Sequence, residues 1–178
     1  MLNSLLNKYF PEDENEKIYK VKMLQLLDIG PLCFSRGLLA GHFTGSAFIV
    51  NQKKTHTLLL KHAKLNCWLQ PGGHCDGDPD VENVAIKEVF EETGLIVEKS
   101  TNPEIFDIDI HKIPERKAVP EHLHYDVRFL FLVDESAKIE ISDESTDLKW
   151  IPFIEIENYN IDESVSRMVE KILTKTSL

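Results

Sequence analysis

The sequence is poor in cysteine, and the few cysteines follow no pattern. Cys33, Cys67 and Cys75 are the three in a chain of 178 residues, and no Cys-x-x-Cys spacing occurs. An odd number of scattered cysteines argues against a disulfide framework and against a structural zinc site built on thiolates. We therefore expect free thiols in a reducing compartment.

Long apolar runs are also missing. No stretch of about 18 apolar residues, the length that a membrane-spanning helix requires, occurs in the chain. The first residues lack the charged segment, apolar run and cleavage site of a secretory leader. The sequence thus predicts a cytoplasmic protein without a membrane partner.

Positive charge is in short supply. The formal net charge is -10, and no basic run interrupts the sequence. Such a balance argues against binding to a nucleic-acid duplex. It remains compatible with a small nucleotide substrate, because a bound metal ion can supply positive charge locally.

The most informative stretch is a glycine-rich segment followed by a short helical pattern. Residues 72–79 read as a loop, and residues 80–92 as a helix that Gly94 ends in a left-handed conformation. We expect Asp78 to cap the helix and Pro79 to occupy its first position. The residues at helical spacing that should face the core are Val81, Val84, Ala85 and Val89.

The same helix carries three carboxylates where local rules disfavour them. Glu88, Glu91 and Glu92 stand at i, i+3 and i+4, so they share a face and repel one another. The helix dipole also disfavours anions in its last turn. On its own this pattern is typical of a solvated acidic face, whereas a divalent cation with oxygen ligands would offset the repulsion.

The remaining pattern predicts a mixed sheet between helices. The first 30 residues favour helix, with Asp13 and Glu16 in a capping-box arrangement. A partly apolar face at helical spacing should pack on the main domain and consists of Ile18, Val21, Leu24, Gln25 and Asp28. We expect strands at 43–50, 57–60, 68–69, 106–111, 123–133 and 148–153, and a final helix at 161–173. The first two strands, joined by a turn-like segment at 51–55, should form a hairpin. The buried stripe of that final helix should consist of Val165, Met168, Val169 and Ile172.

Polar residues alternate along two of these strands. Asp107, Asp109 and His111 should form the exposed face of a half-exposed strand. His122, His124, Asp126 and Arg128 share a face of the next strand. Three interpretations stay open for that face: a solvated surface, a wall of a substrate cleft, and a metal site for which His111 would have to supply a further ligand.

The segment GHCDGDPDVENVAIKEVFEETGL at residues 73–95 resembles the Nudix box, G-x5-E-x7-R-E-U-x-E-E-x-G-U with U aliphatic. The spacing agrees throughout, and the preceding LQPGG and the later WIP stretch are also similar to the family. Two positions depart from the pattern, since Pro79 replaces the first glutamate and Lys87 replaces the arginine. Lysine keeps the charge but loses the planar fork that grips a carboxylate in two places.

The resemblance implies a Nudix-type α/β/α sandwich with a mixed sheet, as a single domain over residues 1–178 with a helical N-terminal extension at about 1–36. It implies hydrolysis of a pyrophosphate bond in a nucleoside diphosphate linked to another group, with Mg²⁺ or Mn²⁺ as cofactor. The expected metal ligands are Glu88, Glu91, Glu92 and the carbonyl of Gly72. The expected catalytic set consists of Glu88, Glu91, Glu92 and Glu144. Glu88 and Glu144 are the alternatives for the general base.

The expected substrate-binding residues are Gly73, Lys87, His124, Asp126 and Arg128. Relatives suggest a possible homodimer. The alternative function is a Nudix-fold module that binds or senses a nucleotide without cleaving it, which the departures at Pro79 and Lys87 motivate.

Overall fold

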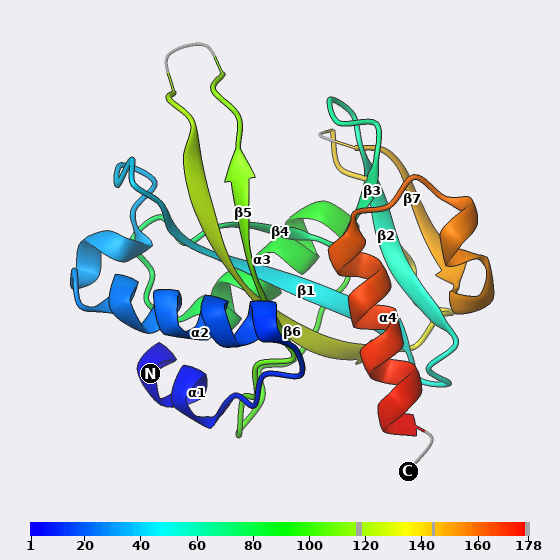
Figure 1. Ribbon diagram of the computed structural model, residues 1–178. Helices are drawn as coiled ribbons and strands as arrows, with labels where there is room; N and C mark the ends of the chain where they lie inside the picture. The colour runs from blue at the N-terminus through cyan, green and yellow to red at the C-terminus, as the bar shows by residue number, and fades with distance from the viewer. Residues whose placement is uncertain (117–118, 144, 177–178) are drawn as a thin grey trace. The chain divides into compact units, whose positions relative to one another are not determined.

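A computed structural model describes residues 1–116, 119–143 and 145–176 (Figure 1). The chain forms two compact units. The first consists of residues 1–46, 72–85 and 99–129, and the second of residues 47–71, 86–98 and 130–178. The fold class is the expected one, a mixed α/β fold with N-terminal helices.

The first unit opens with two helices, α1 (Leu2–Lys8) and α2 (Glu14–Leu27), followed by the short 3-10 helix η1 (Pro31–Phe34). The predicted cap is confirmed, because the Asp13 side chain accepts a hydrogen bond from the Glu16 backbone N–H at 2.8 Å. The chain leaves α2 through Gly30, whose φ of 80° suits glycine.

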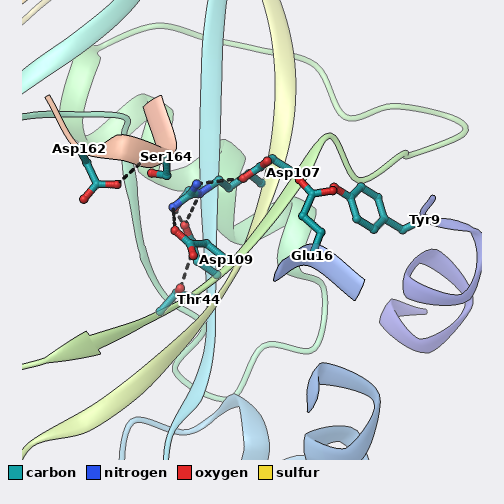
Figure 2. A network of polar contacts seen from close by, with 10 residues as sticks. Tyr9, Glu16, Thr44, Asp107, Asp109, Asp162 and Ser164 are labelled. Atoms are coloured by element: carbon teal, nitrogen blue, oxygen red, sulfur yellow. Dashed lines mark hydrogen bonds and ion pairs between the residues drawn. The ribbon is translucent and has the colours of Figure 1, made fainter. Parts of the chain in front are cut away.

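The predicted buried face of α2 is wrong. Ile18 and Val21 are exposed. The buried residues of α2 are instead Glu16, Met23 and Leu26. The cause is a polar contact with the preceding segment: the Glu16 carboxylate accepts from the Tyr9 hydroxyl at 2.9 Å and from the Glu12 N–H at 2.7 Å (Figure 2). These bonds satisfy a buried carboxylate and set which side of α2 faces inward.

Four strands contribute to the first unit. Strand β1 (His42–Asn51) begins there and pairs with β4 (Gly72–His74), with Thr44 opposite His74 and Ser46 opposite Gly72. Strands β5 (Asp107–Ile113) and β6 (His122–Val133) form a long antiparallel pair (Figure 1). This pairing fixes which residues of the two strands lie side by side.

The second unit contains β2 (His56–His62), β3 (Trp68–Leu69) and β7 (Ser145–Pro152), then η2 (Phe153–Asn158) and α4 (Glu163–Thr176). The predicted β1–β2 hairpin is confirmed by the pairing of Ile49 with Leu58. The predicted stripe of α4 is buried throughout: Val165, Met168, Val169 and Ile172.

In the described part of the chain, seven strands join one sheet in the hydrogen-bonding order β3-β2-β1-β6-β5, with β4 also on β1 and β7 also on β2. None of the described helices is long and apolar enough to cross a lipid bilayer.

Helix α3 (Val81–Thr93) starts later than the sequence suggested. Asp80, not Asp78, accepts the N–H of Asn83 at the start of the helix, at 3.2 Å. Asp78 instead accepts the Asp80 N–H at 2.9 Å and so shapes the turn before the helix. The side-chain cap thus lies two residues further along the chain than predicted.

Candidate active site

Helix α3 presents the three glutamates of the box on one face. The predicted apolar residues are interspersed with the glutamates at i+3, i+4 and i+7 spacings, and all of them are buried: Val81, Val84, Ala85 and Val89. The helix ends as predicted, at a left-handed Gly94 whose N–H donates to the Phe90 carbonyl at 3.0 Å. Fixing the apolar side fixes the direction of Glu88, Glu91 and Glu92.

Lys87 lies one helical turn before Glu91 and contacts it. Its Nζ lies 3.6 Å from a carboxylate oxygen of Glu91, and both side chains are at least half exposed. An exposed pair in this orientation stabilises a helix weakly. Glu91 can therefore turn toward a metal ion at little cost.

The glycines of the box loop are held against strand β1. Gly73 lies opposite Gly45 in the β1–β4 pairing. A Cβ on Gly45 would lie 2.6 Å from the Val81 carbonyl oxygen, closer than any ordinary contact. Glycine at position 45 thus lets the first turn of α3 approach the strand that carries the loop.

Of the two alternatives for the general base, Glu88 lies on α3. Glu144 lies outside the described residues.

The polar strand face predicted as a substrate wall contains a buried ion network. The Arg128 guanidinium donates to Asp126 at 2.7 Å, to Asp107 at 2.9 Å and to Asp109 at 3.0 Å. Asp126 also accepts from the hydroxyls of Thr44 and Ser46 at 2.9 and 2.7 Å. Thr44, Asp107 and Asp109 are labelled in Figure 2. Every nitrogen of the guanidinium is therefore engaged by a carboxylate.

Electrostatics in this network favour the charged forms. Burial alone would raise the pKa of Asp126, but the adjacent Arg128 charge and the hydrogen bonds hold it below its usual value. The three carboxylates likewise outweigh burial and raise the pKa of Arg128. The network joins one guanidinium to three carboxylates inside the first unit.

Two expectations change as a result. The exposed polar face predicted for the 106–111 strand is wrong at Asp107 and Asp109, which are buried against Arg128. Asp126 and Arg128 are each 2% exposed, so direct contact with a substrate is disfavoured for both. The sequence pattern showed that they share a face, but not that a neighbouring strand covers it with carboxylates.

His124 lies in a cluster of histidines. The ring centroids of His42, His74 and His124 are 4.9 to 5.1 Å apart in all three pairs. His122 and His111 flank His124, with centroids at 5.2 and 5.5 Å. Sequence reasoning considered a metal for this strand face but named His111 as the further ligand and missed His42 and His74.

The feature that brings His42 and His74 together is the pairing of β1 with β4. Because Thr44 lies opposite His74, His42 two residues earlier falls on the same side of the sheet. Burial, with the charge of Arg36 next in importance, lowers the pKa of His74 to about 4. Burial, followed by neighbouring histidines, lowers the pKa of His124 to about 3, so both rings are neutral at neutral pH.

The cysteines are free thiols, as expected. Burial, followed by the charge of Asp126, raises the pKa of the Cys75 thiol. A protonated, buried thiol is a poor nucleophile, so Cys75 is inert in this position.

The described geometry agrees with a known family. The model of the NUDIX domain matches residues 42–172. The chain therefore belongs to the NUDIX domain family. A protein of Lactococcus lactis subsp. cremoris named probable DHNTP pyrophosphohydrolase is 26% identical over 158 residues, which cover 88% of this chain and 87% of the relative.

Solved structures show the same fold. A hydrolase of the NUDIX family from Clostridium perfringens aligns with a TM-score of 0.53 at 26% identity, over 74% of this chain and 95% of that chain. The NUDIX domain of Shewanella oneidensis NrtR, solved with ADP ribose, aligns with a TM-score of 0.55 at 17% identity, over 79% and 92%. A bifunctional Francisella tularensis enzyme complexed with AMP and a Mn ion aligns with a TM-score of 0.54 at 16% identity, over 97% and 58%.

Proposed function

We propose that this Nudix-family pyrophosphohydrolase cleaves a pyrophosphate bond in a nucleoside diphosphate linked to another group, and that it requires Mg²⁺ or Mn²⁺. The observation that carries the proposal is the set Glu88, Glu91 and Glu92 on one face of α3, within a box whose spacing to Gly73 and Gly94 is complete. The family match over residues 42–172 supports it.

The donor set fits a hard divalent cation. Carboxylate oxygens suit Mg²⁺ and Mn²⁺ better than the nitrogen and sulfur ligands that zinc prefers. Glu88, Glu91 and Glu92 would hold the ion, and the Gly72 carbonyl remains a prediction from its position in the box. The bound ion neutralises phosphate charge and makes a coordinated water more acidic.

Other residues of the box have proposed roles in proton transfer and in positioning the substrate. Glu88 is the proposed general base among the described residues, and Glu144 remains the alternative. Lys87 is exposed and within 3.6 Å of Glu91, so it can orient that carboxylate or meet a phosphate oxygen. Gly73 lets the backbone approach the substrate closely.

We withdraw Asp126 and Arg128 from the proposed substrate contacts, because both are buried and bonded to each other. They act instead as a support for strands β5 and β6. A role for His124 in substrate binding remains a proposal.

The second proposed function is nucleotide binding without hydrolysis. The Lys87 side chain favours it, because an ammonium group cannot hold a glutamate in the two-point manner of arginine. The presence of all three box glutamates favours the hydrolase.

A metal-dependent activity screen distinguishes the hydrolase from the binding module. The purified protein is incubated with nucleoside triphosphates, including the triphosphate class named for the Lactococcus relative, and with nucleotide sugars and dinucleotides, with Mg²⁺, with Mn²⁺ and with EDTA. We expect phosphate-containing products with either metal and none with EDTA, identified by mass. Tight nucleotide binding without any product would favour the binding module and contradict the hydrolase.

A further inference from the structure

Four of the chain's histidines gather where three strands begin or end. His42 opens β1, His74 ends β4, and His122 and His124 lie at the start of β6 (Figure 1). One ligand nitrogen from each of His42, His74 and His124 lies within 4.8 Å of the other two. All of these residues belong to the first unit.

The hydrogen bonds around His42 leave a lone pair available to the cluster. Its Nδ1 lies 3.4 Å from the Leu38 carbonyl oxygen, so Nδ1 carries the proton and donates. Its Nε2 is buried and has no hydrogen-bond partner among the described residues. An orphaned buried acceptor is costly, and a metal ion would satisfy it.

This arrangement is the one found around metal-binding histidines, where the other ring nitrogen donates to a backbone carbonyl and fixes the tautomer. The ring of His122 is also fixed by a backbone carbonyl, and it contacts His124 with its other nitrogen. Its Nδ1 lies 2.9 Å from the Pro120 carbonyl oxygen, and its Nε2 lies 3.3 Å from Nε2 of His124. His122 thereby holds the ring of His124 in place.

The chemistry of the cluster differs from that of the box. Three neutral imidazoles offer nitrogen donors, which suit zinc and similar transition metals rather than Mg²⁺. Nitrogen ligands of zinc lie about 2.0–2.1 Å from the ion, which places ligand nitrogens about 3.3 Å apart in a tetrahedron. Nitrogens already within 4.8 Å need only small side-chain rotations to reach that spacing.

We propose that His42, His74 and His124 form a second metal site, specific for a divalent transition-metal ion of the zinc type and separate in ligand chemistry from the glutamate site. His122 is a positioning residue that orients His124. The site stands on histidine geometry alone, so it does not depend on the hydrolase proposal.

Zinc titration of the metal-free protein tests the proposal. The probe is Zn²⁺ alone, followed by calorimetry with excess Mg²⁺ present to occupy carboxylate sites, and by X-ray absorption of the loaded protein. We expect one tight zinc per chain, unaffected by Mg²⁺, in a shell that contains three imidazole nitrogens at about 2.0–2.1 Å.

Variants at the half-buried histidines identify the ligands. His74→Gln and His124→Ala should each weaken zinc binding by roughly 100-fold or more, since each removes a ligand. His62→Ala, in the second unit, is the matched control and should bind zinc like the wild type. Thermal unfolding of the metal-free variants tests whether each is folded. If His124→Ala does not fold, the His74→Gln variant alone tests the proposal.

Two outcomes would overturn the proposal. One is wild-type zinc affinity in a folded His74→Gln variant. The other is an oxygen-only shell in the absorption spectrum, which would place the ion on carboxylates.

Discussion

At the scale of the residue, Arg128 is the side chain whose surroundings matter most to the fold. It is 2% exposed and contacts three carboxylates on two strands. A buried ion group of this kind adds little net stability over an apolar replacement of the whole set. Removing a single partner is different, because it leaves buried charge uncompensated.

Replacing Arg128 should therefore destabilise the protein strongly. Arg128→Met leaves three buried carboxylates without their cation, and we expect the free energy of unfolding to fall by about 3–5 kcal/mol. Urea denaturation followed by circular dichroism measures it.

Arg36→Met is the matched control. Arg36 pairs with Asp76 at 2.5 Å, but both side chains are more than half exposed, so its loss should cost about 0–1 kcal/mol. Equal losses in the two variants would show that burial of the Arg128 network contributes nothing.

At the scale of the element, the contact between strand β1 and the first turn of α3 positions the box. Gly45 is the closest point of approach, with the Val81 carbonyl and the Val84 Cβ within 3.2 Å of the place a Cβ would occupy. A backbone carbonyl cannot move aside as a flexible side chain can. The helix that carries the glutamates is thus placed by a residue without a side chain.

Gly45→Ala should push the helix and the strand apart. We expect a loss of about 1–3 kcal/mol in unfolding free energy, as overpacking in a well-packed interior typically costs. Gly37→Ala is the control, because the nearest atom to its added Cβ is the Ser35 hydroxyl at 3.4 Å. If the chemical denaturation midpoints of the two variants coincide, the close approach at Gly45 has no energetic weight.

Much of the element order followed from sequence because the signals were local. The β1–β2 hairpin, the stripe of α4 and the left-handed Gly94 each depend on residues near one another in the chain. The buried face of α2 did not follow, since it depends on a bond from Tyr9 to Glu16.

The candidate site was likewise predictable only where its signal was local. Fixed spacing within one segment of the sequence predicted that Glu88, Glu91 and Glu92 share a helix face, and all three lie on α3. The Arg128 network and the histidine cluster escaped prediction because each requires a strand register: Asp107 opposite Arg128, and Thr44 opposite His74. A shift of one residue in either register would turn those side chains to the other face.

At the scale of the whole molecule, the chain combines a net charge of -10 with an expected substrate that is itself an anion. Like charges oppose association, and under the proposed function a cation at the box glutamates would supply the local attraction. The proposed activity should therefore depend on the charge of single glutamates on α3 and far less on glutamates elsewhere.

The most direct measurement is the Mg²⁺-dependent rate of pyrophosphate cleavage by Glu91→Gln and Glu92→Gln, on the best substrate from the screen. Each change keeps the size of the side chain and removes its charge, and we expect kcat/KM to fall by roughly 100-fold or more with unfolding temperatures unchanged. Glu98→Gln, the same change at an exposed position outside the box, should keep the wild-type rate. Wild-type rates in either box variant would contradict the assignment of the glutamates to the metal.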